Sequence, residues 1–365
     1  MHDSMRIDLA DLLLDVVARR ASDLHLTAGA KPTIRVRGRL TPLEDYPVLD
    51  TQDTREIVYS ILTNDQRQRL ETDWQLDFAY TIPGKARFRV NAYFQRAAIG
   101  AAFRLIPFEI VGIDELGLPP VIHEMTKKPR GFVLVTGPTG SGKSTTLAAM
   151  IDAINETREE HILTVEDPIE FLHGHKRCIV NQRELGSDAQ SFSAALKAAL
   201  RQDPDVILVG EMRDLETIHT ALTAAETGHL VFATLHTQDA PQSIDRIIDV
   251  FPAEQQGQVR TQLSVALQGV VTQQLLPTAD GSGRVAACEV LVPNAAVRNQ
   301  IREGKTHQIY STMQTGGSHG MQTMDAALAA LVRAGHITRQ LAEQRSSTPD
   351  ELGRLLGGGG MSMAA

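Results

Sequence analysis

The chain has few cysteines, few aromatic residues and no long apolar run. Its 365 residues include two cysteines, Cys178 and Cys288, which stand far apart and match no metal-ligand spacing. We therefore expect reduced thiols rather than disulfides or a zinc site. No apolar stretch approaches the ~18 residues that a membrane-spanning helix needs, and the N-terminus has no apolar signal-peptide core. These absences predict a cytoplasmic protein without direct membrane insertion.

Positive charge is also in short supply. The formal net charge is −8, and aromatic residues make up 4% of the chain. A dedicated nucleic-acid-binding protein usually carries a basic surface, so no nucleic-acid partner is expected, although a local basic patch is compatible with this composition. The hydrophobic share of 42% and the length suffice for two globular domains.

One short segment has a highly restricted pattern. Residues 137–144 read Gly-Pro-Thr-Gly-Ser-Gly-Lys-Ser, which fits the phosphate-binding loop G-x-x-x-x-G-K-[ST]. The apolar residues 132–135 before it predict a buried strand, and residues 145–154 after it predict a helix. Strand, glycine-rich loop and helix form the context in which such a loop binds phosphates. The sequence therefore predicts a site for a nucleoside triphosphate.

The residue types of this loop have chemical reasons. Gly140 and Gly142 let backbone N–H groups converge on the phosphates, and the helix N-terminus adds positive potential. Lys143 is expected to reach the β- and γ-phosphates, and the hydroxyl of Ser144 to bind Mg²⁺. The predicted nucleotide-binding residues are Gly137, Pro138, Thr139, Gly140, Ser141, Gly142, Lys143, Ser144 and Thr145.

The first part of the chain, residues 1–106, predicts a small mixed α+β domain. Apolar residues recur at helical spacing over residues 8–20. Alternation of apolar and polar residues over 33–40 predicts one half-buried strand. Three further strands are expected at 77–82, 87–93 and 100–105, the first two joined by a turn at Pro83-Gly84.

The pattern changes near residue 121. Residues 107–120 carry Pro, Gly and acidic residues without a long period, and we interpret them as a linker. Strands and helices then alternate, which predicts an α/β domain with a parallel sheet over residues 121–343. Strands are expected at 162–165, 206–209 and 230–235, followed by a mainly helical remainder. Residues 344–365 predict a flexible tail.

Polar side chains follow three of the expected parallel strands. In open parallel sheets the ligand lies beyond the carboxyl ends of the strands. Glu166 and Asp167 stand there after one strand, Glu211 after a second and His236 after a third. This repetition predicts that the four side chains lie near the nucleotide.

Glu211 is the candidate general base. The segment 205–211 resembles a second NTPase motif in which Gly210 displaces the usual acidic residue by one position. A carboxylate at this strand end can orient and deprotonate an attacking water. His236 is expected either to sense the γ-phosphate or to hold Glu211. The candidates for organising Mg²⁺ and its waters are Glu166, Asp167 and Glu170.

Three further residues have roles that the pattern alone leaves open. His229 begins the strand that ends at His236, so geometry gives it no clear role. Arg89 and Arg104 lie on expected strands of the first domain. They are either solvated on a sheet face or supply a cation to a nucleotide when the protein assembles.

These motifs resemble those of the secretion and type IV pilus ATPase family, over about residues 8–338. Its Asp box is matched by 162–171, its atypical Walker B motif by 205–214 and its His box by 227–237. The resemblance implies that Glu211 occupies the catalytic position and that His229 and His236 serve the same site. It also places Arg89 and Arg104 where the family keeps arginines that contact the nucleotide as the two domains close.

The resemblance also implies an architecture and an activity. It implies a RecA-like P-loop ATPase domain behind a smaller PAS-like N-terminal domain, assembled into a homohexameric ring. The implied cofactors are ATP and Mg²⁺. The implied partner is a PilC-like platform protein of the inner membrane, to which the cytoplasmic ring is peripheral. In the ring, ATP hydrolysis would drive pilus disassembly, and with it pilus retraction and twitching motility.

Two features distinguish retraction motors from their relatives. Pilus-extension and type II secretion motors usually carry a four-cysteine zinc module, which two isolated cysteines cannot form. Residues 296–303 resemble the retraction signature Ala-Ile-Arg-Asn-Leu-Ile-Arg-Glu, with changes at Val297 and Gln300. The alternatives are an extension or secretion motor, a related paralogue, a conjugation-type DNA-transport ATPase with a basic pore, and a nucleotide switch that needs no catalytic acid.

Overall fold

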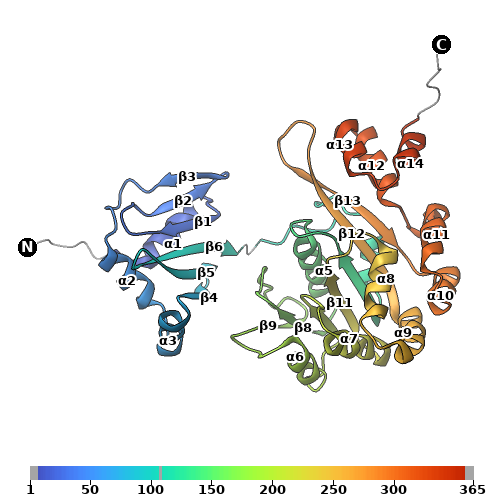
Figure 1. The fold of residues 1–365 in the computed structure, drawn as a ribbon, viewed down its shortest axis with the longest axis horizontal. Coiled ribbons are helices and arrows are strands. Elements are labelled where there is room, and N and C mark those ends of the chain that lie inside the picture. The colour runs from blue at the N-terminus through green and yellow to red at the C-terminus, as the bar shows by residue number, and fades with distance from the viewer. Residues whose placement is uncertain (1–6, 107–108, 358–365) are drawn as a thin grey trace, which may run out of the picture. The chain divides into compact units, whose positions relative to one another are not determined.

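The computed structural model describes residues 7–106 and 109–357 (Figure 1). The chain forms two compact units. One contains residues 1–109 together with 170–172, and the other contains 110–169 together with 173–365. The first division falls within the segment 107–120 that the sequence suggests as a linker.

The first unit is a six-stranded antiparallel sheet with helices, in the strand order β3-β2-β1-β6-β5-β4. Leu12 and Leu13 of its first helix are fully buried together with Phe88 and Phe103 of the two longest strands. The predicted turn at 83–84 is confirmed, since the Lys85 N–H donates to the Ile82 carbonyl over 3.0 Å. The elements are α1 (Leu9–Ala18), β1 (Asp23–Leu26), β2 (Thr33–Val36), β3 (Arg39–Pro42), α2 (Thr51–Ser60), α3 (Asn64–Asp73), β4 (Gln75–Ile82), β5 (Ala86–Gln95) and β6 (Ala98–Ile106).

The prediction of a single strand over residues 33–40 is wrong, because the chain turns there. Val36 at the end of β2 pairs with Arg39 at the start of β3. Arg37 and Gly38 between them have φ values of 49° and 81°. Such left-handed conformations are typical of a tight hairpin turn. Apolar and arginine residues continue to alternate across the turn, so the alternating sequence pattern does not reveal the turn.

The second unit is built on a seven-stranded sheet in the order β13-β12-β7-β11-β10-β8-β9. All its paired neighbours are parallel except β12 and β13, so the predicted parallel sheet is confirmed. Its strands are β7 (Gly131–Thr136), β8 (His161–Glu166), β9 (Ile179–Glu184), β10 (Val206–Val209), β11 (Leu230–Leu235), β12 (Leu267–Pro277) and β13 (Arg284–Leu291).

Both faces of the central strand β7 are covered by helices. Phe132 and Leu134 pack into one hydrophobic cluster with residues of α7, α8 and α9. Val133 and Val135 pack into another cluster with residues of α5. Burial on both faces explains why this strand is a continuous apolar run. The helices are α4 (Val121–Thr126), α5 (Lys143–Thr157), α6 (Phe192–Ala199), α7 (Leu215–Thr227), α8 (Ala240–Asp249), α9 (Ala253–Ala266), α10 (Ala295–Arg302), η1 (Thr306–Gln308), α11 (Ile309–Thr315), η2 (Gly317–His319), α12 (Met324–Arg333), α13 (Arg339–Arg345) and α14 (Pro349–Leu355).

Two sequence-based expectations for the C-terminal part need correction. The remainder after residue 235 is not mainly helical throughout, since β12 and β13 form an antiparallel pair at one edge of the sheet. Residues 344–357 are not a featureless tail either, because α14 places Leu352, 1% exposed, in a hydrophobic cluster. Residues 358–365, with most of the glycine run, lie outside the described residues.

No helix within the described ranges combines the length and apolar character that a membrane crossing requires.

Candidate functional site

The glycine-rich loop joins the end of β7 to the start of α5. Lys143 is the first residue of α5, and its side chain folds back over the loop. Its Nζ donates hydrogen bonds to the carbonyls of Gly137 over 2.8 Å and Pro138 over 3.0 Å. Residues 138–140 at the crest are exposed, whereas Lys143 is 9% exposed. The loop therefore presents its backbone to solvent while the lysine charge lies directly beneath.

Gly137 is required by close packing against the neighbouring strand. A Cβ at this position would lie 2.4 Å from the carbonyl oxygen of Gln273 and 2.7 Å from the hydroxyl of Ser141. Its φ of +136° also disfavours any other residue. Gln273 on β12 is 1% exposed, and its Nε2 donates to the hydroxyl of Thr146 in α5 over 2.9 Å. The glycine-rich loop therefore packs directly against β12, a contact that the sequence did not predict.

The carboxylate of Glu211 lies between two basic side chains. Its Oε1 is 3.2 Å from Nε2 of His236, and its Oε2 accepts a hydrogen bond from Arg213 over 2.6 Å. The hydrogen bond from Arg213 holds the pKa of Glu211 below its ordinary value; burial opposes this shift, and the charges of Arg213, His236 and Lys143 add to it. Glu211 is therefore ionised near neutral pH, as a general base must be.

The displaced position of this acid has a packing explanation. A Cβ on Gly210 would stand 3.2 Å from Cα of Glu166 and from the carbonyl oxygen of Val165. The Gly210 N–H also donates to that Val165 carbonyl over 2.8 Å. The residue directly after β10 packs closely against β8, so position 210 requires a residue without a side chain. The acid therefore follows one position later, at Glu211.

Glu166 and Asp167 lie at the end of the neighbouring strand β8. Oε1 of Glu166 accepts hydrogen bonds from the hydroxyl of Thr164 over 2.6 Å and from Nε2 of Gln182 over 3.1 Å. Asp167 is exposed, precedes a cis peptide bond to Pro168, and its charge acts on Arg213. Within residues 7–106 and 109–357, no group of three or more His, Cys, Asp or Glu side chains could hold a metal ion by itself.

The remaining predicted site residues are distributed over both units, and the one in the second unit, His229, does not lie at this cluster. His229 lies at the opposite end of β11 from His236, about 23 Å away at ~3.3 Å per residue. Its Nδ1 is 3.0 Å from the carbonyl oxygen of Ala224. Glu170 is exposed and belongs to the short segment grouped with the first unit. Arg89 and Arg104 are exposed cross-strand neighbours within the first unit.

Arg104 has a partner that sequence reasoning missed. Its Nε donates to Oδ1 of Asp23 over 2.9 Å, and Arg35 lies 3.8 Å from the other carboxylate oxygen. Asp23 is 7% exposed, and its pKa is lowered: burial raises it, but hydrogen bonds from Ser22 and Arg104 prevail. The pairing orients Arg104 on the sheet while leaving its side chain 71% exposed.

The segment 296–303, which resembles the retraction signature, forms most of α10 and ends at its C-cap residue, Glu303. Arg298 donates to the carbonyls of Ser264 and Val265, the latter over 2.9 Å, and so satisfies the C-terminal end of α9. Gln300, one of the two departures from the signature noted in the sequence, donates to the hydroxyl of Thr312 over 2.9 Å. The departure from the signature is therefore matched by a polar partner.

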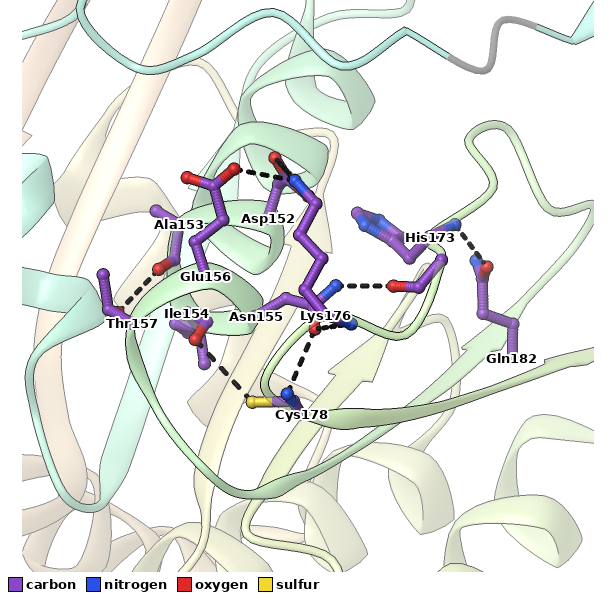
Figure 2. A network of polar contacts seen from close by, with 11 residues as sticks. Asp152, Ala153, Ile154, Asn155, Glu156, Thr157, His173, Lys176, Cys178 and Gln182 are labelled. Atoms are coloured by element: carbon purple, nitrogen blue, oxygen red, sulfur yellow. Dashed lines mark hydrogen bonds and ion pairs between the residues drawn. The ribbon is translucent and has the colours of Figure 1, made fainter.

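The connection that follows Glu166 and Asp167 is fastened to α5 by one buried side chain (Figure 2). Asn155 donates to the Gly174 carbonyl over 2.7 Å, and its Oδ1 accepts from the N–H groups of Lys176 over 3.2 Å and Cys178 over 3.3 Å. On the other side, Oε1 of Gln182, whose Nε2 bonds Glu166, accepts from the N–H of His173 over 2.8 Å. The connection after β8 is therefore hydrogen-bonded both to α5, through Asn155, and to Glu166, through Gln182.

Asn155→Ala is expected to lower the free energy of unfolding by about 2–4 kcal/mol, because three backbone groups lose a buried partner. Lys176→Ala is the matched control. Its ammonium group pairs with Asp152 and Glu156 at 2.8 Å but is 41% exposed, so the expected loss is under about 1 kcal/mol. Urea denaturation of both variants measures the difference; equal losses would contradict the role given to Asn155.

Together these elements define an α/β protein with a glycine-rich loop, a lysine and an ionised glutamate at the carboxyl edge of a mostly parallel sheet. A family model described as Type II/IV secretion system protein matches residues 2–344. The chain belongs to this family, as its motifs predicted.

Individual relatives match over almost the whole chain. A Pseudomonas aeruginosa PAO1 protein, "Type IV pilus retractation ATPase PilT", is 52% identical over 344 residues, 94% of this chain and 99% of that protein. A Neisseria gonorrhoeae "Twitching motility protein" is 50% identical over 339 residues, covering 91% of this chain and 90% of that protein. The crystal structure of "the Pilus Retraction Motor PilT and Bound ADP" has a TM-score of 0.89 at 51% identity, covering 95% of this chain and 99% of that one.

Proposed function

We propose that this chain is an ATPase whose hydrolysis of ATP powers the retraction of type IV pili, and so twitching motility, by driving pilus disassembly. The observation that carries the proposal is the likeness to a pilus retraction motor with bound ADP, at 51% identity over 95% of the chain. It is supported by the ionised Glu211, which contacts His236 and whose carboxylate is influenced by the charge of Lys143, since a carboxylate in this state could act as the general base of hydrolysis.

In this proposal the second unit is a RecA-like P-loop domain. Backbone N–H groups of residues 139–145 and the Lys143 ammonium bind the phosphates, so Lys143 exchanges its hydrogen bonds with the carbonyls of Gly137 and Pro138 for bonds to the ligand. Glu211 takes the proton of the attacking water. Before this proton transfer, His236 and Arg213 each contact one oxygen of the Glu211 carboxylate and favour its ionised form.

Mg²⁺ fits the oxygen donors beside the loop. Mg²⁺ is usually held by one or two protein oxygens, with phosphates and waters completing its shell, so a complete protein cage is not needed. Ser144 in the first turn of α5 and the carboxylates of Glu166 and Asp167 would hold the ion directly or through its waters. When bound, it neutralises charge on the phosphates.

We further propose that the first unit is a PAS-like domain and that the protein works as a cytoplasmic homohexameric ring on a PilC-like inner-membrane platform protein. Retraction rather than extension is favoured because a sequence with two cysteines far apart cannot form a four-cysteine zinc module. In that ring, His229, Glu170, Arg89 and Arg104 would reach a nucleotide only when the units close or subunits meet.

The proposal is tested by deleting the gene in its own bacterium and scoring surface pili together with twitching. Loss of a retraction motor leaves cells piliated but immotile, and the wild-type gene restores movement. Cells without pili would instead identify an extension motor, and motile piliated cells would refute a principal role in retraction.

Arg104→Ala is expected to lower ATP turnover by about 10³-fold or more without preventing assembly, because an arginine that neutralises transition-state charge has effects of this size. Arg35→Ala removes the other cation near Asp23 and serves as the matched control, with turnover close to wild type.

Mixing Arg104→Ala with Lys143→Ala subunits identifies the site that Arg104 serves. Partial recovery of activity in the mixed ring means that it acts on a neighbour's nucleotide, and no recovery means that it acts on its own. Unchanged turnover in Arg104→Ala rings would show that Arg104 has no role in hydrolysis and serves only as the ion-pair partner of Asp23.

A further inference from the structure

The segment that carries Glu211 lies between two regular elements and belongs to neither. β10 ends at Val209, α7 begins at Leu215, and residues 210–213 have no helical or strand structure. The last pair of the β10–β11 ladder is Val209 with Ala233. Beyond that pair, no repeating ladder determines the backbone, so the direction of the Glu211 side chain depends on individual contacts.

Thr234, the next residue of β11, bonds to the peptide groups on both sides of Glu211. Its hydroxyl donates to the carbonyl of Gly210, and its own carbonyl oxygen accepts from the N–H of Met212 over 3.3 Å. The first bond acts on the peptide before Cα of Glu211, and the second acts on the peptide after it. Because a residue has only the two soft dihedrals φ and ψ, restraining both peptides restrains the direction of its Cα–Cβ bond.

The other anchors of this segment act further from Glu211. The Gly210 N–H, which donates to the Val165 carbonyl, belongs to the peptide before Gly210. The Met212 side chain is 4% exposed and packs into a hydrophobic cluster, which fixes the chain one residue beyond Glu211. Neither contact restrains the peptide that joins Gly210 to Glu211, whereas the Thr234 hydroxyl does.

A hydroxyl at position 234 is not required by packing. All six residues of β11, Leu-Val-Phe-Ala-Thr-Leu, are buried, and Thr234 is the polar one among them at 6% exposure. Valine has nearly the same shape and the same preference for strands. A buried hydroxyl is costly unless it is hydrogen-bonded, and here its bond goes to Gly210. The polar atom therefore serves the segment next to β11 rather than the core.

The same end of β11 also contacts the carboxylate of Glu211. Nε2 of His236, two residues after Thr234, lies 3.2 Å from Oε1 of Glu211. β11 thus restrains the backbone of Glu211 through Thr234 and its carboxylate through His236. Positioning matters for a general base, since a displacement of about 1 Å can cost about 10²-fold in rate.

We propose that Thr234 is a positioning residue for hydrolysis: its hydroxyl, by restraining the backbone at Glu211, directs the carboxylate toward the attacking water. Thr234 itself contacts neither the nucleotide nor the water in this role. The role deepens the proposed function and rests on Glu211 acting as the base.

Thr234→Val in the full-length protein tests this role, because valine keeps the shape of the side chain and removes only the hydroxyl. The kcat for ATP hydrolysis is expected to fall by about 10–100-fold, while the KM for ATP and the binding of a fluorescent nucleotide stay close to wild type. Thr234→Ser keeps the hydroxyl and should recover most of the turnover. Wild-type kcat in Thr234→Val, or an equal loss in Thr234→Ser, overturns the proposal.

Thr126→Val is the matched control. Thr126 is also 6% exposed, and its hydroxyl donates to the carbonyl of His123 over 2.8 Å. It lies near the end of α5 opposite to Lys143, where Arg158 donates to its carbonyl over 3.1 Å. Both valine variants lose one buried hydroxyl bond, so similar shifts of the urea midpoint are expected. Turnover should fall in Thr234→Val alone, and an equal fall in Thr126→Val would refute a specific role.

A double-mutant cycle with Glu211→Gln shows whether Thr234 acts through the base. In single-turnover hydrolysis, adding Thr234→Val to Glu211→Gln is expected to change the rate by less than about 2-fold, because the carboxylate that Thr234 directs is already gone. A further loss as large as in the wild-type background would contradict the proposal. Slow hydrolysis in Glu211→Gln with wild-type hydrolysis in Thr234→Val refutes the role of Thr234 alone. Wild-type hydrolysis in Glu211→Gln would refute the proposed base, and the role of Thr234 with it.

Discussion

Lys143→Ala is expected to abolish ATP turnover, with a loss of about 10²–10³-fold or more, and to weaken nucleotide binding. The lysine is the only residue of the segment 137–145 whose side chain carries a charge, and it lies buried beneath the loop crest. Removing a preorganised positive charge from a site of transition-state charge has effects of this size. Steady-state ATPase assays together with binding of a fluorescent nucleotide measure both losses.

Two controls make this result specific. Lys176→Ala removes a lysine that pairs with α5 at a surface position, and its turnover should stay near that of the wild type. Sedimentation must show that the Lys143→Ala protein assembles as the wild type does. Near-normal ATPase activity in an assembled Lys143→Ala protein would rule out the site.

Glu211→Gln is expected to separate binding from hydrolysis. The amide keeps the size of the side chain but cannot accept a proton, so turnover should fall by about 10²-fold or more while ATP affinity stays close to wild type. Glutamine also retains an oxygen that can accept from Arg213, which limits the structural disturbance. Single-turnover hydrolysis and equilibrium ATP binding distinguish the two effects.

Glu216→Gln is the matched control, because Glu216 is an exposed acid on α7 that pairs with Lys197. It should leave both ATP binding and turnover unchanged. A Glu211→Gln protein that fails to bind ATP but hydrolyses whatever it holds at the normal rate would show that Glu211 grips the nucleotide and is not the base.

Local patterns predicted the centre of the site, and neighbouring strands supplied what the patterns could not. The glycine-rich loop has a fixed spacing, and the rule that ligands lie at the carboxyl edge of parallel strands correctly grouped Glu211 with His236. Arg213 was missed because an exposed arginine two residues after a motif resembles any surface residue. Its contact with Glu211 depends on the path of the chain after β10.

The errors in the fold have similar causes. β12 carries Thr272 and Gln273, each 1% exposed, at buried positions, so the strand lacks the apolar character that predicts an interior strand. These polar residues have partners on other elements: the hydroxyl of Thr272 meets that of Thr136 at 2.8 Å, and Nε2 of Gln273 donates to the hydroxyl of Thr146 over 2.9 Å. Only the tertiary structure reveals such partners, because they lie more than 100 residues away.

The hydrogen bonds between Asn155 and the connection after β8 are expected to slow deuterium uptake in that connection. A segment outside regular structure normally exchanges its amide hydrogens within the first time points, through local openings of low free energy. The amides of Lys176 and Cys178 cannot open in this way, since both donate to a side chain anchored in α5. They should exchange with the slow kinetics of the helix that begins at Lys143, so part of this connection behaves as one cooperative unit with the glycine-rich loop helix.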